Sequence, residues 1–321
     1  MSGASPPTLL VLRALGLGDL LAAVPALRAL DAAFSEHRRV LATTAPMGPL
    51  ARCVAGFDDI IAVEPLGPLP GGLRPDVAVN LHGRGPQSHQ VLLALRPRRL
   101  VAFACGDVRG PEWRAGEHEA DRWCRMLTEH GIPADPAQID IVAPPEPAGL
   151  PDVRGATLVH PGAAFGARRW PPERWAVVAR HEASRGRQVF VTGGPTETDL
   201  AGEVVTRAGL PEASNLAGRT DVLGLAALVA QAGRLLSADT GVAHLATALR
   251  CPSVVLFGPV SPAEWGPPAS RPWHIALWRG RRGDPLGEHC DPGLLLIEPA
   301  DVVAALDQLD AQPGPRRPSP G

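Results

Sequence analysis

Short apolar runs of strand length alternate along the chain with longer segments whose apolar residues recur at helical spacing. In the first half the expected strands are residues 8–14, 38–44, 59–65, 76–83 and 98–104, and the clearest helix is residues 19–34. In the second half the expected strands are residues 156–163, 187–194, 234–239 and 251–259, and the expected helices are residues 171–186, 196–210, 222–233 and 241–250. This alternation predicts an α/β fold with mostly parallel sheets that helices cover on both faces.

A proline-rich break at residues 143–156, APPEPAGLPDVRGA, separates the two halves and predicts a linker. We therefore expect an N-terminal domain over residues 1–145 and a C-terminal domain over residues 146–310. The tail at residues 311–321 is rich in proline, glycine and arginine, and we expect it to be disordered. Open α/β sheets bind ligands beyond the carboxyl ends of their strands, which is where the polar residues of this sequence gather.

Composition narrows the class of protein. A net charge of −2 over 321 residues argues against a general nucleic-acid-binding protein, which carries a basic surplus. The five scattered cysteines form no C-x-x-C pair, which suits reduced thiols better than a disulfide framework or a zinc site. The start, MSGASPP, lacks the pattern of a signal peptide, and polar residues interrupt the most apolar region, residues 222–249. We therefore expect a cytoplasmic protein without a transmembrane helix.

The stretch LLSADTGVAHLATAL joins an expected strand to an expected helix through Asp239, Thr240 and Gly241. If the Asp-Thr pair caps the helix, the first amides stay free, and together with the helix dipole they form a site for a phosphate. His244 lies about one turn further along and can face the same ligand. The alternative is a capped helix with a half-buried histidine and no ligand.

The segment HPGAAFGARRW offers a second anion site. Its small residues, Gly162, Ala163 and Ala164, let a ligand approach the backbone amides closely. Arg168 follows, and its planar guanidinium can bridge two phosphate oxygens while a bond to a sugar breaks. The alternative is that Arg168 and Arg169 are an ordinary pair of surface arginines.

The segment LGLGDLL, after the first strand, resembles half of a dinucleotide fingerprint, but the last glycine of G-x-G-x-x-G is missing. No acidic residue ends the second strand either, so a nicotinamide oxidoreductase is the weakest hypothesis. Asp19 stands at a helix start beside Gly18. It serves either as an N-cap or as a general base for a substrate hydroxyl.

Two more strand ends carry polar residues. In TGGPTE, Gly194 precedes Glu197, which either accepts hydrogen bonds from a ribose diol or is a plain first-turn acid. NLHGRGPQSH, in the first half, suits a sugar or another hydroxylated acceptor, and the alternative there is a solvated loop. Its candidate acceptor residues are His82, Arg84, Gln87 and Ser88.

Taken in order, these segments resemble glycosyltransferase family 9, the bacterial heptosyltransferase family, over roughly residues 9–259. The resemblance rests on GDLLAAVPAL, NLHG, HPGA with RRWP, TGGPTE and DTGVAHLATAL, followed by FGP. It implies a GT-B architecture, in which two Rossmann-like domains face each other across a cleft. The C-terminal domain would hold the nucleotide sugar, typically ADP-heptose, and the N-terminal domain would hold the acceptor.

The resemblance also implies roles for single residues. Asp19 matches the catalytic base, and Arg168 matches a position, often lysine in the family, that stabilises the departing diphosphate. The implied donor-site residues are Gly162, Ala163, Ala164, Gly194, Glu197, Thr220, Asp239, Thr240, Gly241 and His244. Gly18 joins His82, Arg84, Gln87 and Ser88 on the acceptor side.

The reaction implied is an inverting sugar transfer that uses no bound metal and no cofactor beyond the nucleotide sugar. We expect a monomer with no nucleic-acid partner, and peripheral membrane contact stays open. The acceptor also stays open among a saccharide, a lipid-linked sugar and a natural product. The alternatives to a transferase are a nucleotide-sugar epimerase and a non-catalytic nucleotide-sugar-binding protein.

Overall fold

The computed structural model describes residues 6–145 and 149–312. It divides the chain into two compact units, Met1–Ile141 and Val142–Gly321, each with its own sheet and its own core. The division lies close to the domain boundary predicted between residues 145 and 146. Residues 313–321, most of the predicted disordered tail, lie outside the described residues.

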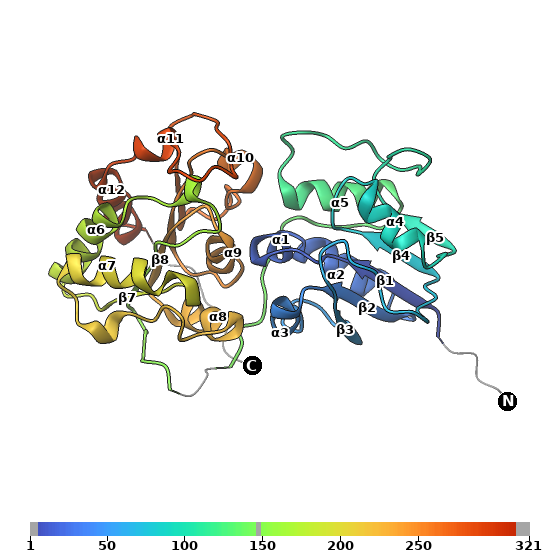
Figure 1. Ribbon diagram of the computed structural model, residues 1–321, viewed down its shortest axis with the longest axis horizontal. Helices are drawn as coiled ribbons and strands as arrows, with labels where there is room; N and C mark the ends of the chain where they lie inside the picture. The colour runs from blue at the N-terminus through green and yellow to red at the C-terminus, as the bar shows by residue number, and fades with distance from the viewer. Residues whose placement is uncertain (1–5, 146–148, 313–321) are drawn as a thin grey trace. The chain divides into compact units, whose positions relative to one another are not determined.

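The first unit is built on a five-stranded parallel sheet with the strand order β3-β2-β1-β4-β5 (Figure 1). Its strands are β1 (Thr8–Leu12), β2 (Arg38–Thr43), β3 (Asp59–Ala62), β4 (Val77–Asn80) and β5 (Arg99–Val101). Its helices are α1 (Leu17–Ala22), α2 (Val24–Ala33), α3 (Gly48–Ala51), α4 (Gln87–Leu93) and α5 (Glu119–Glu129), with a 3₁₀ turn at Ala45–Met47.

Both faces of this sheet are buried, as the continuous apolar strands require. On one face Leu10 and Leu12 of β1 pack with Val40, Ala78 and, from α4, Leu92. The intervening residues of β1 are also fully buried, and on the other side of the sheet α2 lies against α5. Helices therefore cover both faces, which leaves the ends of the strands as the places where loops gather.

The second unit contains another five-stranded parallel sheet, with the order β10-β9-β8-β6-β7. Its strands are β6 (Thr157–His160), β7 (Val189–Val191), β8 (Arg234–Ala238), β9 (Ser253–Leu256) and β10 (His274–Leu277). Its helices are α6 (Pro172–Ser184), α7 (Thr198–Ala208), α8 (Val222–Gln231), α9 (Gly241–Ala248), α10 (Pro262–Trp265), α11 (Pro292–Leu295) and α12 (Pro299–Asp310). Short 3₁₀ turns occupy Gly166–Arg168, Pro195–Glu197 and Glu212–Ser214.

Figure 1 shows α6, α7 and α12 together on one side of this unit and α8 and α9 on the other. The larger core cluster joins the sheet to α6, α7 and α12, and Trp170 and Trp175 meet in it edge to face, with ring centroids 4.8 Å apart. On the opposite face Ala243 of α9 packs with Val255 and Phe257. The predicted fold class, an α/β fold with two parallel-sheet domains, is confirmed.

The helix predicted over residues 19–34 is in fact two helices, α1 and α2, which meet at Ala23. Pro25 is the cause, because proline has no N–H to donate and its ring clashes with the carbonyl one turn earlier. Proline is tolerated in the first turn of a helix, and Pro25 stands there in α2. The break leaves α1 as a short helix of six residues whose first turn carries Asp19.

Candidate functional site

Both sheets change their direction of growth at one point: between β1 and β4 in the first unit, and between β6 and β8 in the second. Open α/β sheets bind ligands at such points, beyond the carboxyl ends of the strands. Several of the predicted site residues lie there, with Asp19 after β1, His82 after β4, Gly162 after β6 and Asp239 after β8. The topology therefore gives each unit one candidate site of its own.

In the first unit Asp19 lies in the first turn of α1, whose N-cap residue is Gly16. No side-chain hydrogen bond caps this helix, so the hypothesis that Asp19 is an N-cap is wrong. Its side chain is 34% exposed, and one carboxylate oxygen lies 3.5 Å from Nη2 of Arg13. The carboxylate is thus anchored on one side and accessible on the other, as a general base requires.

His82 lies close to Asp19 in the candidate site of the first unit. Its Nδ1 accepts a hydrogen bond from the Ala14 amide at 3.3 Å, which fixes the ring beside the end of β1. Burial lowers the pKa of His82, the Arg13 cation lowers it further, and the Asp19 carboxylate raises it. Nδ1 as an acceptor corresponds to a neutral imidazole whose Nε2 carries the proton.

The other predicted acceptor residues are placed differently from one another. Gly18 is half-buried within α1, and Arg84 and Gln87 are exposed on the loop after β4 and at the start of α4. Ser88 is buried, and its hydroxyl accepts a hydrogen bond from Asn80 Nδ2 at 2.9 Å. Ser88 thus supports the loop from inside.

Sequence reasoning missed Arg13 and Glu119, which contact each other at 3.4 Å beside Asp19. Arg13 is 1% exposed, and its guanidinium lies 5.1 Å from the ring centroid of Trp123. A lone arginine directly after the apolar run LLVL was the available signal. Glu119 offered none, because it lies 106 positions away at the start of a helix that the pattern did not single out.

In the second unit the structure brings Arg168 and Asp239 together. Nη1 of Arg168 lies 3.9 Å from Oδ2 of Asp239 and 3.5 Å from its backbone oxygen. Burial raises the pKa of the Asp239 carboxyl to about 6, and the Arg168 cation opposes this shift. Asp239 is 4% exposed, whereas the Arg168 side chain is 29% exposed and so remains open to a ligand.

Thr240 is the N-cap residue of α9, but its side chain makes no capping hydrogen bond. The expected Asp-Thr cap is therefore wrong, since neither side chain satisfies the first amides. Among the described residues, the hydroxyl oxygen of Thr240 and Nε of Arg168 are buried without a hydrogen-bond partner. Buried polar groups are nearly always partnered, so these two atoms indicate that a ligand binds near the start of α9.

His244 lies one turn into α9, half-buried, with its ring centroid 5.8 Å from that of Trp265. Thr220 is half-buried directly before Asp221, whose carboxylate caps α8 through the Gly224 amide at 2.8 Å. Of the small residues after β6, Ala163 is buried and Ala164 is exposed.

Glu197 joins Gly162 and Gly194 in a tight cluster. Its Oε2 accepts a hydrogen bond from the Gly194 amide at 2.7 Å and lies 3.9 Å from Nε2 of His160. A Cβ on Gly162 would overlap the Glu197 carboxylate, so only glycine allows this approach. Burial lowers the pKa of His160, which Glu197 opposes, and Nδ1 of its ring lies 3.0 Å from the Thr192 hydroxyl.

Residues 287–291, which lie more than a hundred positions later in the chain, contact the turn that carries Arg168. The Ala167 amide donates to the Gly287 oxygen at 2.9 Å, and the Asp291 amide donates to the Ala167 oxygen at 3.2 Å. A Cβ on Gly166 would overlap the Glu288 carbonyl, so the two backbones lie in direct contact. Residues 287–291 therefore support the turn that carries Arg168 through direct backbone contacts.

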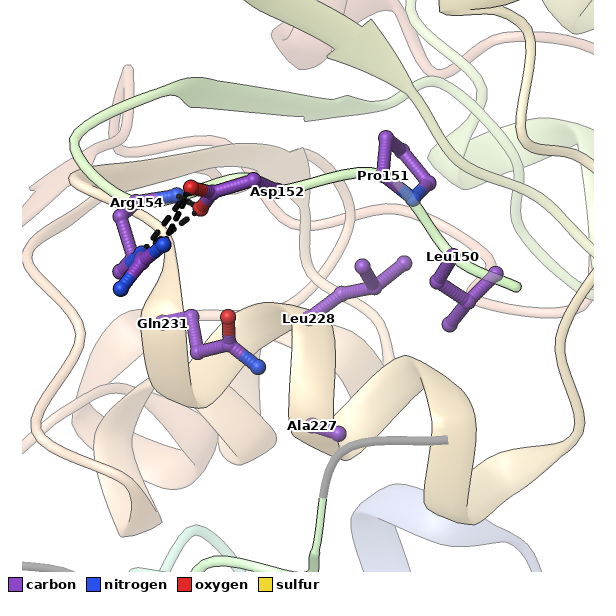
Figure 2. A pocket seen from close by; sticks show the side chains of 7 residues that line it. All are labelled: Leu150, Pro151, Asp152, Arg154, Ala227, Leu228 and Gln231. Atoms are coloured by element: carbon purple, nitrogen blue, oxygen red, sulfur yellow. Dashed lines mark hydrogen bonds and ion pairs between the residues drawn. The ribbon is translucent and has the colours of Figure 1, made fainter. Parts of the chain in front are cut away.

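Two hollows of the described structure lie away from these residues. A small pocket of about 160 Å³ lies between residues 150–154 and α8, and Figure 2 shows the ion pair of Asp152 and Arg154 beside it. A larger groove of about 820 Å³ in the first unit is lined by Arg74, Arg96 and Arg98 near the amino ends of β1, β4 and β5. The lining of neither hollow includes a predicted site residue.

Within residues 6–145 and 149–312, no group of three or more His, Cys, Asp and Glu side chains is arranged to hold a metal ion. None of the helices in these two ranges is long and apolar enough to cross a membrane.

Comparison with known proteins adds to the geometry. The model of "Glycosyltransferase family 9 (heptosyltransferase)" matches residues 134–282. The chain is 31% identical over 158 residues to lipopolysaccharide heptosyltransferase 2 of Escherichia coli K12, a match that covers 46% of this chain and 45% of that protein. The chain thus spans about half the length of the curated relatives it matches.

Two solved structures share the fold over almost the whole chain. A family 9 glycosyl transferase from Veillonella parvula superimposes with a TM-score of 0.76 at 19% identity, covering 95% of this chain and 97% of that one. The E. coli ADP-heptose lipopolysaccharide heptosyltransferase II gives 0.74 at 21% identity, with 94% and 98% covered. The two solved structures show the shared fold, and the match over residues 134–282 confirms the resemblance to glycosyltransferase family 9, the heptosyltransferase family, that the sequence predicts.

Proposed function

We propose that this protein is an inverting glycosyltransferase that moves a heptose from ADP-heptose to a hydroxyl group of an acceptor. The observation that carries the proposal is the start of α9, where Arg168 and Asp239 converge and two buried polar atoms lack partners. A diphosphate supplies acceptors for both the guanidinium and the free amides of the helix. The names of related proteins supply the sugar, because several are heptosyltransferases and one is described with ADP-heptose.

In this proposal Asp19 is the general base. It takes the proton from the acceptor hydroxyl while that oxygen attacks the anomeric carbon from the side opposite the diphosphate. The bond from carbon to the diphosphate oxygen breaks, its electron pair leaves with ADP, and the anomeric centre is inverted. The exposed side of the Asp19 carboxylate supports this role, because a base must reach the proton it removes.

The donor would be held by residues of the second unit. Arg168 neutralises the charge that develops on the leaving diphosphate, and the amides of Thr240 and Gly241 bind its oxygens. Asp239 accepts hydrogen bonds from sugar hydroxyls, since a carboxylate beside a phosphate would repel it. Glu197 binds the ribose in this proposal. Its Oε2 accepts a hydrogen bond from the Gly194 amide, and its Oε1 accepts one from the ribose diol.

For the acceptor we propose a chemical class and no single compound. His82, exposed Arg84 and exposed Gln87 offer the first unit hydrogen-bond donors for a hydroxylated saccharide, a lipid-linked sugar or a natural product. We propose that the protein acts as a monomer and that its chemistry needs no metal ion. Light scattering tests the first statement, and transfer rates with and without a chelator test the second.

A thermal-shift panel of ADP-, UDP-, GDP- and dTDP-sugars tests the donor. A ligand that binds only the folded state raises the midpoint by mass action, so ADP-heptose must raise it more than the other three nucleotide classes. Asp19→Asn must keep this shift while lowering transfer by about 10²–10⁴-fold, the usual contribution of a general base. Glu36→Gln, an exposed acid of the same unit, is the matched control and must leave transfer unchanged.

Two outcomes contradict the proposal in different ways. A product formed from the donor alone, without acceptor, indicates an epimerase. Binding of ADP-heptose without turnover on any of a panel of saccharide, lipid-linked and small-molecule acceptors indicates a non-catalytic binding protein.

A further inference from the structure

Arg13, the residue directly after β1, has a guanidinium that joins three other elements of the first unit. Its Nε and Nη2 donate to the backbone oxygen of Asp19 in α1 at 2.9 and 2.6 Å. Its Nη1 donates to the backbone oxygen of Leu81, directly after β4. Nη2 also lies 3.4 Å from Oε1 of Glu119 in the first turn of α5. The buried Arg13 cation, 1% exposed, therefore connects the turn of Asp19 with the residue that follows β4.

Glu119 is fixed as firmly as Arg13. Its Oε1 accepts a hydrogen bond from Nε1 of Trp123 at 2.8 Å, and its Oε2 pairs with Arg122. The carboxylate is buried at 5% exposure, so its position is set by packing and not by solvent. Buried charges are retained when they are paired and hydrogen-bonded, and Glu119 supplies the charge that Arg13 needs.

The contacts of Arg13 with Asp19 are uneven. Two short hydrogen bonds go to the backbone oxygen of Asp19, whereas the distance to its carboxylate is 3.5 Å. The same backbone oxygen accepts the Ala23 amide at 3.2 Å, which closes the last turn of the six-residue helix α1. Arg13 thus fixes the turn that carries Asp19 while leaving the carboxylate 34% exposed.

We propose that Arg13, held in place by Glu119, is a positioning residue that orients Asp19 for proton abstraction; this rests on the proposed function. A displacement of about 1 Å in a catalytic group costs about 10²-fold in rate, so the orientation of this turn controls turnover. Glu119 acts through Arg13 and reaches no reacting atom. The orientation of Asp19 therefore depends on Glu119 in the first turn of α5, which lies 106 positions from Arg13 in the sequence.

The test is a double-mutant cycle with ADP-heptose and an acceptor that the wild-type protein uses. Arg13→Met is expected to lower kcat about 10- to 100-fold with the KM for ADP-heptose unchanged, and Arg13→Lys recovers part of the loss. Glu119→Gln, nearly isosteric and safer for folding, lowers kcat in the same direction. In the Asp19→Asn background neither substitution lowers kcat further, because both act through that carboxylate.

Glu117→Gln is the matched control. Glu117 lies just before α5 and pairs with Arg125 at 2.6 Å instead of with Arg13, so kcat must stay unchanged. An equal fold loss from Glu119→Gln in both backgrounds overturns the proposal, and so does an unchanged kcat. Should the wild-type protein transfer no sugar, the proposed function fails, and hydrogen exchange decides this inference alone. Glu119→Gln must then accelerate exchange of the Ala23 amide selectively, and unchanged exchange overturns the inference.

Discussion

Nη1 of Arg168 lies 3.9 Å from Oδ2 of Asp239, although the two residues are 71 positions apart in the sequence. The distance is longer than that of a closed, hydrogen-bonded ion pair, which is about 2.7–2.9 Å. The carboxylate is therefore buried without full compensation, and the guanidinium keeps donors for another partner. An anion placed at the start of α9 would meet both the guanidinium and the helix dipole.

Asp239→Asn is expected to change how stability depends on pH. The folded protein holds the Asp239 proton up to about pH 6, whereas the unfolded chain releases it near the ordinary value of 3.8. The free energy of unfolding therefore falls as pH rises through this window, by up to about 3 kcal/mol for a two-unit shift. Asp239→Asn removes this fall and is more stable than the wild type at pH 7.5.

Urea unfolding at pH 4.5 and pH 7.5 measures the difference. Asp199→Asn, an exposed acid in the first turn of α7, is the control and must follow the wild-type profile. A parallel pH profile for Asp239→Asn and the wild type would show that the buried carboxyl does not titrate in this window.

Arg168→Lys is expected to weaken donor binding while leaving stability nearly unchanged. Lysine keeps the charge but loses the planar fork that binds two oxygens at once. We expect a loss of about 1.5–3 kcal/mol in the binding of ADP, the range for a hydrogen bond to a charged group. Titration calorimetry with ADP measures it. Arg207→Lys, whose native partner is exposed Glu203, must bind ADP as the wild type does.

Gly162→Ala is expected to lower donor affinity more than stability. The new methyl group would occupy the place of the Glu197 carboxylate, which must then leave the Gly194 amide. A flexible side chain can move at small cost, so the melting temperature stays within a few degrees while the KM for ADP-heptose rises about tenfold. Gly48→Ala is the matched control, since its methyl group would lie 3.7 Å from Ile60, an ordinary contact. An unchanged KM for Gly162→Ala would remove Glu197 from the donor site.

Glu182→Ala is expected to destabilise the second unit strongly. Glu182 is 1% exposed, accepts the Thr157 hydroxyl at 2.5 Å and lies 3.7 Å from both Arg187 and Arg234. Removing it leaves a buried cation short of a partner, which costs about 3–5 kcal/mol. Glu203→Ala removes only an exposed pair on one helix and must cost no more than about 0.5 kcal/mol. Denaturant midpoints followed by tryptophan fluorescence compare the two variants.

Much of the fold could be predicted, because its parallel strands are short runs of apolar residues. Nine of the expected runs contain the strands β1 to β9. The helix α5 was not predicted, although its buried residues Ala120, Trp123, Cys124 and Leu127 recur at helical spacing. β10 was also missed, since it is four residues long and only His274 in it is buried. β10 depends on its pairing with β9, which no local pattern reveals.

The positions of the candidate residues could also be predicted, since residues after β6 and β8 must meet at one edge of the sheet. The hydrogen bonds that these residues make could not be predicted. Thr240 stands at the N-cap of α9 but its side chain does not cap the helix, and Asp19 lies three residues past the N-cap residue of α1, Gly16. Capping depends on side-chain rotamers that respond to neighbours such as Arg13, and the sequence gives no access to those.

The contact between Gly166 and Glu288 affects how this protein should be cut or shortened. The match to the family model ends at residue 282, but residues 287–291 make the backbone contacts that support the turn of Arg168. A fragment that ends at residue 282 would contain each predicted donor residue but would lack the segment that supports Arg168. Truncation series and chimaeras of the second unit should therefore keep the chain at least through α11.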